Sequence, residues 1–255
     1  VLSISRNNKY IDRFRGRIMF PIIDLSGNVL GFGGRILKGD EKSAKYINSP
    51  ESLIYKKSEI LFGLFNSREE IRAKNNVIFT EGYLDVIQLY QNGIKNVVAT
   101  SGTAFTEKQA RLIKRFTSNI DLCFDSDKAG QNAILKAGLL ILNFDFEVRV
   151  ILLPEGEDPD SYVFKNGPEA FMKFQEQAIP FSKFFIQYFS SSYDMKNFRS
   201  RQDAINSALE MLSDLQNKLL ANYLLEEMAF ITNAPLPSLQ NQLQNLWNQK
   251  ERYRN

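Results

Sequence analysis

The sequence predicts an α/β protein with a parallel-sheet core that carries helices on both faces. Three observations support this prediction. Between residues 66 and 165, short apolar runs alternate with helical patterns, as in consecutive βαβ units. Residues 1–65 are rich in β-forming runs and basic side chains, and residues 166–255 place apolar side chains at helical spacing. We therefore expect a β-rich basic subdomain at 1–65, an α/β core at 66–165 and a helical subdomain at 166–255.

Composition narrows the classes of function. The chain has 255 residues, 44% of them hydrophobic, with one cysteine and no histidine. Because Cys123 lies in an apolar strand pattern, we expect a core residue, no disulfide, no zinc site in this fragment and no histidine-dependent catalysis. Apolar runs stay shorter than the ~20 residues of a membrane helix. We expect a cytoplasmic protein, and Val1 at the start suggests a piece of a longer chain.

Charge is distributed unevenly along the chain. Residues 1–75 carry 14 Lys and Arg against 8 Asp and Glu, whereas residues 76–165 carry 9 against 12. A basic lobe beside an acidic lobe suits a protein that binds a polyanion together with metal ions.

The basic subdomain begins with an arginine-rich run. Arg13, Arg15 and Arg17 alternate along the chain, so on a strand they would share one face, although a solvated edge strand gives the same pattern. Two β-rich runs follow at 17–25 and 28–37, and the Ser-Gly-Asn sequence at their junction predicts a hairpin.

Further basic residues of this subdomain have aromatic neighbours. Tyr46 follows Lys45, and Tyr55 lies two residues before Lys57, downstream of Arg35. Cations that contact phosphates and rings that stack on bases are what single-stranded nucleic acid and nucleotides require.

The alternating pattern of the core gives specific elements. We expect strands at 76–80, 96–99, 119–124 and 147–153, and helices at 67–74, 84–91, 106–116 (with Thr106 as its N-cap) and 128–142. In the C-terminal part we expect helices at 167–177, 180–189, 200–215 and 218–231 and a last amphipathic helix near Leu239, Leu243 and Leu246.

Acidic residues follow three of the predicted strands. Asp125 and Asp127 are two positions apart and would point to one side of an extended backbone. Close carboxylates repel each other unless a cation lies between them, and Mg²⁺ prefers carboxylate ligands. Taken alone, this pair is also typical of a solvated turn. Glu81, and Asp158 with Asp160, follow other strands, and the carboxyl ends of parallel strands form a shared crevice. We therefore expect all five carboxylates to converge on one metal site.

These motifs resemble a known family. Glu81-Gly-Tyr-Leu-Asp-Val, Ser101-Gly-Thr, Phe124-Asp-Ser-Asp-Lys-Ala-Gly and Gly156-Glu-Asp-Pro-Asp resemble the Toprim signature. With Asp12-Arg-Phe-Arg-Gly-Arg and Gly31-Phe-Gly-Gly-Arg before them, they resemble the RNA polymerase domain of bacterial DnaG-type primases over roughly residues 10–165.

The resemblance implies an RNA-primer-synthesising nucleotidyltransferase that acts on single-stranded DNA with ribonucleoside triphosphates. It implies that Glu81 is essential for catalysis, as a base or as a ligand, and that Asp125, Asp127, Asp158 and Asp160 hold Mg²⁺ or Mn²⁺. We expect the nucleotide, primer or template to be bound by Arg13, Arg15, Arg17, Arg35, Lys45, Asn48, Lys57 and Lys128.

The resemblance also implies parts that we expect to lie outside this chain. Such primases begin with a zinc-binding domain, and we expect the start of their polymerase domain to be truncated here. A helicase-binding domain normally follows, so we expect contact with the replicative helicase through a C-terminal domain absent here.

Two other classes of function remain open at this stage. A Toprim nuclease needs only the acidic cluster, and a non-catalytic module that binds single-stranded nucleic acid needs only the basic one. The presence of both favours the primase. A type IA topoisomerase would need a nucleophilic tyrosine in a separate domain, and no region resembles one.

Overall fold

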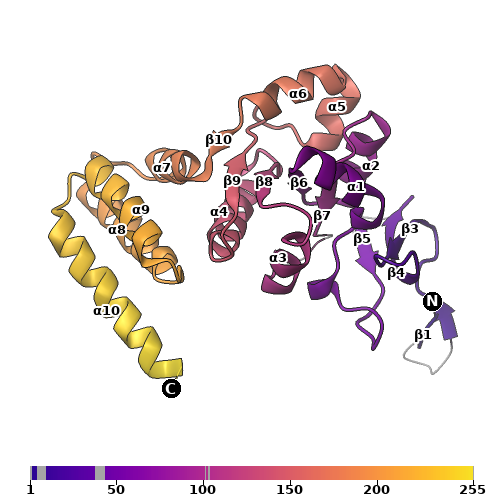
Figure 1. The fold of residues 1–255 in the computed structure, drawn as a ribbon, viewed down its shortest axis with the longest axis horizontal. Helices are drawn as coiled ribbons and strands as arrows, with labels where there is room; N and C mark the ends of the chain where they lie inside the picture. Colours follow the sequence, from indigo (N-terminus) through magenta and orange to yellow (C-terminus); the bar gives the residue numbers. More distant parts are fainter. Residues whose placement is uncertain (1, 5–9, 38–43, 101, 103, 255) are drawn as a thin grey trace.

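A computed structural model describes residues 2–4, 10–37, 44–100, 102 and 104–254. The N-terminal strands lie at one end of the molecule, the parallel sheet lies in the middle, and the last three helices lie at the other end (Figure 1). Ser101 and Thr103 of the Ser-Gly-Thr motif fall outside the described residues.

The N-terminal part contains two small antiparallel sheets. One pairs β1 (Leu2–Ile4) with β2 (Tyr10–Asp12), and the other has the order β3 (Arg17–Ile23), β4 (Val29–Ile36), β5 (Tyr46–Asn48). The predicted hairpin is therefore confirmed. Its turn is stabilised by the carboxylate of Asp24, which accepts hydrogen bonds from the backbone N–H groups of Ser26 and Asn28 at 2.8 and 2.9 Å. A short 3₁₀ helix, η1 (Lys57–Glu59), follows.

The predicted arrangement of the arginine-rich run was wrong. Residues 13–16 form turns between β2 and β3, so Arg13, Arg15 and Arg17 do not share the face of one strand. The physical reason is local, because the Asp12 carboxylate accepts the Phe14 N–H at 3.0 Å and turns the backbone.

The core is a five-stranded sheet of order β10-β9-β8-β6-β7. Its parallel strands are β6 (Val77–Thr80), β7 (Val97–Ala99), β8 (Asn119–Leu122) and β9 (Glu147–Val150), and β10 (Ile179–Pro180) is an antiparallel edge. The connecting helices are α1 (Leu64–Lys74), α2 (Tyr83–Gln91), α3 (Glu107–Ile113) and α4 (Lys128–Leu142). The predicted parallel sheet is confirmed, and Thr106 caps α3 as predicted.

Helices cover both faces of this sheet. Val77 and Phe79 of β6 join a core cluster with residues of α1, α3 and α4, whereas Ile78 joins a second cluster on the opposite face. That second face is covered by α2, α5 (Pro159–Asn166) and α6 (Pro168–Glu176). Helix α5 was not predicted, because its sequence begins with the acidic loop assigned to the end of a strand. Cys123 is fully buried, as expected of a core residue.

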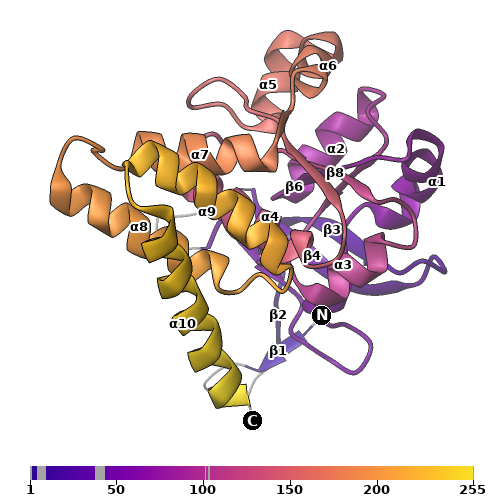
Figure 2. The same ribbon diagram turned by 60° about the vertical axis from the view of Figure 1, so that its left-hand side comes forward.

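The C-terminal helices extend the first cluster away from the sheet. They are α7 (Phe181–Ser192), α8 (Phe198–Leu212), α9 (Lys218–Thr232) and α10 (Leu236–Arg254), of which the last three pack on one another (Figure 2). Tyr188 of α7 donates a hydrogen bond from its hydroxyl to Asn132 Oδ1 of α4 at 2.5 Å. None of the described helices is long and apolar enough to cross a membrane.

An aromatic contact joins the N-terminal sheet to the core. Tyr83, at the start of α2, stacks on Phe20 of β3 with 5.1 Å between ring centroids, and its hydroxyl donates to Asn48 Oδ1 at 2.7 Å. A Cβ at Gly33 of β4 would lie 2.5 Å from the same tyrosine ring, so this close approach requires glycine.

Candidate active site

Most of the predicted site residues surround one cavity of about 660 Å³ at the carboxyl end of the sheet. The core contributes an acidic wall, and the N-terminal sheet, the turns that adjoin its strands and η1 contribute a basic wall. The charged side chains that line the cavity are Glu81, Asp85, Asp125, Asp158, Asp160, Arg13, Arg35, Lys45 and Lys57, together with the amide of Asn48.

Glu81 follows β6 directly and is partly buried. Its Oε1 atom is buried and has no hydrogen-bond partner. Burial raises the pKa of the Glu81 carboxyl, and the charges of Asp125 and Asp127 raise it further, against a backbone hydrogen bond at Asp125 that lowers it. A buried oxygen that lacks a protein partner is suited to contact a ligand or a cation.

Asp125 and Asp127 have different surroundings. Asp125 lines the cavity, and its pKa is raised by burial and by Asp158 and Asp127, while Lys45 lowers it. Asp127 is exposed and caps α4, because its Oδ1 accepts the Gly130 N–H at 2.7 Å. A Cβ at Gly130 would lie 2.1 Å from the carbonyl oxygen of Asp125, so glycine is required where α4 begins. Asp127 lies beside the cavity rather than in its wall, near enough to raise the pKa of Glu81.

Asp158 and Asp160 come from the loop between β9 and α5. Asp158 Oδ1 accepts the Ser161 N–H at 2.7 Å and caps α5, and Asp160 lies in the first turn of that helix. Burial and the charge of Asp158 raise the pKa of Asp160, whereas Arg35 and Lys45 lower it. Both carboxylates line the cavity.

Asp85 is a site residue that the sequence reasoning missed. It lies in the first turn of α2, is 8% exposed, and its Oδ2 accepts the Gly82 N–H at 2.8 Å. Burial raises the pKa of Asp85 to about 7, and the charges of Asp125, Asp158 and Asp160 contribute to that rise. Its position in the Glu81 motif could have indicated it. An acidic residue in the first turn of a helix lies near the end of the strand that precedes the helix.

The basic wall contains only some of the basic residues that the sequence predicted for nucleotide and nucleic-acid binding. Arg13 Nε donates to the carbonyl oxygen of Asn48 at 3.1 Å, and Arg35 lies 6.0 Å from the ring centre of Tyr46. Lys45 is close enough to lower the pKa of both Asp125 and Asp160. The acidic and basic walls therefore face each other across the cavity.

Three predicted basic residues do not line this cavity: Arg15, Arg17 and Lys128. Arg17 donates to the carbonyl oxygens of Gly34 and Ala44 at 3.1 and 2.9 Å, so it supports the backbone that leads to Lys45. Arg15 is exposed on its turn, and Lys128 is exposed at the first position of α4.

The donor set fits a hard divalent cation. Carboxylate oxygens predominate, they raise one another's pKa, and one of them is buried without a partner. Within the described residues, however, no three Asp, Glu or Cys side chains lie together as a group that could hold a metal ion. The convergence of the five predicted carboxylates on one metal thus stays a prediction, and four of them line the same cavity.

Family models match three parts of the chain. Residues 1–68 match the DNA primase catalytic core N-terminal domain, residues 78–163 match a Toprim-like model, and residues 182–233 match the DnaB-helicase binding domain of primase. We expected the helicase-binding part to lie beyond this chain, and that expectation was wrong, because α7, α8 and α9 carry its match.

Curated and solved relatives agree with these matches. A DNA primase of Clostridium acetobutylicum is 40% identical over 218 residues, which is 84% of this chain but 35% of that protein, so the chain spans about a third of its length. A DNA primase domain from Pseudomonas aeruginosa is 34% identical with a TM-score of 0.82, covering 95% of this chain and 77% of that one. A DnaG primase catalytic domain solved with bound single-stranded DNA is 38% identical with a TM-score of 0.74, covering 89% and 74%. This chain belongs to the DnaG-type family of bacterial DNA primases.

Proposed function

We propose that this chain carries out metal-dependent synthesis of short RNA primers on single-stranded DNA during replication in the cytoplasm. One observation carries the proposal. The carboxylates of Glu81, Asp125 and Asp160 face the cations of Arg35 and Lys45 across a single cavity. Nucleotidyl transfer needs this combination, because a triphosphate must be held while negative charge builds up on it. The match to a primase catalytic domain with bound single-stranded DNA supports the choice of template.

The acidic wall would hold Mg²⁺ or Mn²⁺ mainly through Asp125, Asp158 and Asp160, with Glu81, Asp127 and Asp85 beside them. When bound, such an ion neutralises charge on the reacting phosphates and orients them. Burial and neighbouring carboxylates raise the pKa of Glu81, Asp125 and Asp160, so a bound cation would relieve the repulsion within this wall.

The remaining roles belong to side chains of the chain itself. Arg35, Lys45 and Lys57 bind the triphosphate from the opposite wall. The 3′-hydroxyl oxygen attacks the α-phosphorus, a new phosphodiester bond forms, and the α–β bond breaks to release pyrophosphate. Glu81 is placed to accept the hydroxyl proton, because its buried Oε1 has no hydrogen-bond partner and burial raises the pKa of the carboxyl, which makes the carboxylate a stronger base.

The proposed function also implies the ligands and the protein partner of this chain. We propose ribonucleoside triphosphates, the RNA primer and the DNA template as ligands of the cavity and its basic rim. The replicative helicase is the proposed partner of residues 182–233, on the strength of the family match.

A single incubation tests the proposal against the alternatives. Protein, single-stranded template, ribonucleotides and Mn²⁺ should yield labelled oligoribonucleotides. Cut DNA would instead favour a nuclease, and neither product would favour a binding module.

Thermal unfolding tests the metal site independently of activity. Mn²⁺ at about 100 times its Kd should stabilise the protein by about 2.7 kcal/mol, because it binds only the folded state. The Asp125→Ala/Asp127→Ala double variant should lose this gain. A control that removes the exposed acids Glu169 and Asp203 should keep it. Equal stabilisation of both variants would contradict the proposed metal site.

A further inference from the structure

A second cavity of about 500 Å³ lies directly beside the first. It opens between α4 and the residues Ala104 and Phe105, on the face of the sheet opposite α2 and α5. Glu81 and Gly102 line both cavities. Glu81 therefore stands between two separate spaces, and its buried Oε1 has no partner in either.

The two cavities differ in charge. Four Lys and Arg side chains line the first cavity, whereas the second has Lys136 as its one cationic side chain among the described residues. A triphosphate with its metal ions suits the first cavity. A group that carries about one negative charge, such as a nucleoside joined through one phosphodiester, suits the second.

The lining of the second cavity is mainly apolar. The rings of Phe105 and Phe124 form part of its wall, and Phe105 is held edge-on to Phe79 with 5.1 Å between ring centres. The small side chains of Ala104 and Ala133 leave the space open. Aromatic and aliphatic surfaces of this kind bind a nucleobase or ribose face without demanding a particular sequence.

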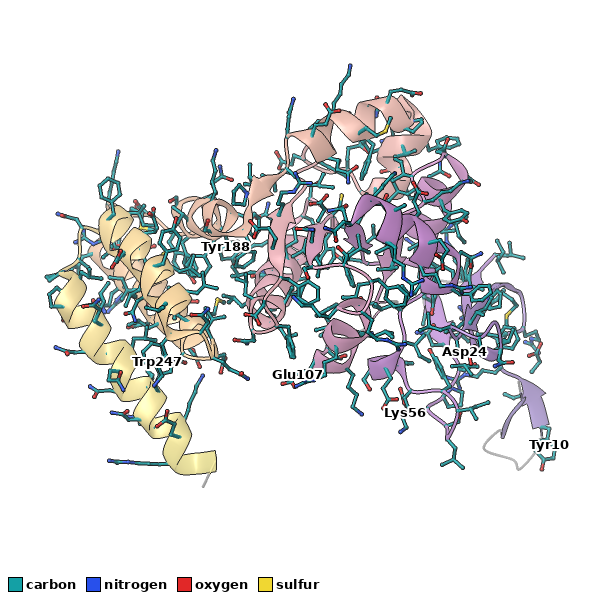
Figure 3. All side chains as sticks on the ribbon, viewed as in Figure 1. Tyr10, Asp24, Lys56, Glu107, Tyr188 and Trp247 are labelled. Carbon is teal, nitrogen blue, oxygen red and sulfur yellow. The ribbon has the colours of Figure 1, made fainter. Side chains whose placement is uncertain are left out.

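Two polar groups face this apolar wall from consecutive turns of α4, namely Asn132 and Lys136. The hydroxyl of Tyr188 on α7 donates a hydrogen bond to Asn132 Oδ1 at 2.5 Å (Tyr188 is labelled in Figure 3). The amide is thereby oriented, and its Nδ2 group is left as the donor for a ligand oxygen. Lys136, one turn further along, can neutralise a phosphate.

We propose that this second cavity, lined by Glu81, Phe105, Phe124, Asn132, Ala133 and Lys136, binds the acceptor nucleotide, which is the 3′-terminal residue of the growing RNA. We call it the acceptor pocket. The proposal rests on the proposed function and assigns its two nucleotide substrates to opposite sides of Glu81. The 3′-hydroxyl then reaches Glu81 from the acceptor pocket, while the α-phosphate reaches it from the first cavity. Transfer joins these two groups and leaves the new 3′ end to move into the acceptor pocket.

The test titrates a ribotrinucleotide primer into the protein at saturating template, ribonucleotide and Mn²⁺ and measures its extension. Ala133→Leu fills the acceptor pocket and should raise the primer KM about tenfold, as expected for loss of one good contact. Lys136→Ala should raise it about threefold and reduce the slope of log KM against log salt by about one, because one phosphate contact is lost. The KM of the incoming ribonucleotide should stay within about twofold of wild type.

Matched controls come from α6 on the other face of the sheet. Ala170→Leu and Lys173→Ala make the same chemical changes on that helix and should leave the primer KM unchanged. Melting temperatures identify any variant that loses its fold, and Lys136→Ala, at an exposed position, tests the proposal even if Ala133→Leu is unstable.

Three results would overturn the assignment. An unchanged primer KM in Lys136→Ala and in a folded Ala133→Leu would remove the acceptor pocket. A rise in ribonucleotide KM alone would make it the site of the incoming nucleotide, and weaker binding of template without primer would make it a template site. In each case wild type still extends primers, so the proposed function survives. Failure of wild type to extend any primer would overturn both.

Discussion

The core holds two kinds of buried carboxylate. Asp121, in the middle of β8, is completely buried, and each of its oxygens lies 2.8 Å from a guanidinium nitrogen of Arg149 on β9. Gln175 donates a third hydrogen bond to Asp121 at 3.1 Å. Glu81, at the carboxyl end of the neighbouring strand, has a buried oxygen with no partner, and its acidic neighbours raise its pKa.

This difference in pairing distinguishes a carboxylate that stabilises the fold from carboxylates that can bind a ligand. A buried carboxylate that is fully paired within the fold holds that fold together and has little left to offer a ligand. A cluster of carboxylates that is only partly paired carries a cost in the free protein, and a cation or substrate can remove that cost. Four predictions test whether the two kinds of carboxylate behave this differently.

The largest effect should come from breaking the paired carboxylate. Arg149→Ala leaves Asp121 buried with only Gln175, and the free energy of unfolding should fall by about 3 kcal/mol, the lower end of the range because Arg149 is partly exposed. Denaturant titration measures the loss. Arg199→Ala, at an exposed position on α8, is the control and should change stability little. A loss below about 1 kcal/mol in Arg149→Ala would mean that the pair is not structural.

For Glu81 we expect a large loss of activity without a loss of stability. Glu81→Gln should reduce primer synthesis by about 100-fold, as for the loss of a general base. Without metal, its stability should be unchanged or slightly higher, because a repelling charge is removed. Most of the Mn²⁺-induced stabilisation should remain. Glu155→Gln, in the exposed loop before α5, is the matched control. Activity within a few-fold of wild type would show that Glu81 has no catalytic role.

The pH dependence of stability should reveal Asp85. Its folded-state pKa of about 7 lies above its ordinary value of 3.8, so the unfolded chain releases this proton first. Metal-free stability should therefore fall as the pH rises from about 4 to 7 and stay lowered above that. We expect a fall of roughly 2 kcal/mol, less than full linkage gives, because neighbouring carboxyls titrate together.

Asp85→Asn isolates that contribution. The variant should lose most of the slope between pH 4 and 7, whereas Asp203→Asn, an exposed change on α8, should retain it. Chemical unfolding at each pH in the presence of a chelator is the measurement. A slope that is the same in both variants would assign the pH dependence to other groups.

The smallest effect should come from the basic wall. Lys45→Ala should weaken nucleotide or primer binding by about 1 kcal/mol and reduce its salt dependence, because one phosphate contact is lost. The free energy of unfolding should not change, since Lys45 is exposed. Lys95→Ala, at an exposed position before β7, is the control. If Lys45→Ala binds with wild-type affinity and the same salt dependence, the basic wall does not contact the phosphates and is only a solvated surface.

The sequence predicted elements with strong periodicity well. The bounds of α4 agree with the expected 128–142, and the four parallel strands lie within their expected ranges. Local apolar periodicity indicates these elements, so they can be predicted without tertiary information. Helix α5 was missed because Asp158 and Pro159 open a helix in a stretch that reads as an acidic loop.

Side-chain direction was harder to predict. Alternation along a strand placed Arg13, Arg15 and Arg17 together, but turns separate them. The two-residue spacing paired Asp125 with Asp127, but Asp127 turns back to cap α4. Asp85 lies in the acidic wall because α2 begins beside that wall and Asp85 is in its first turn. Each of these outcomes depends on a turn or a cap, which the spacing of residues does not encode.

The contact between Gly33 and Tyr83 has a consequence for building hybrid enzymes. The tyrosine ring occupies the space that any side chain at residue 33 would need, and its hydroxyl donates a hydrogen bond to Asn48 at the end of β5, in the basic wall. Residues 1–65 of this chain therefore cannot be grafted onto the core of another primase as an independent cassette. A productive graft must bring the glycine, the asparagine and the tyrosine together, since without all three the cations would no longer face the acids at the right spacing.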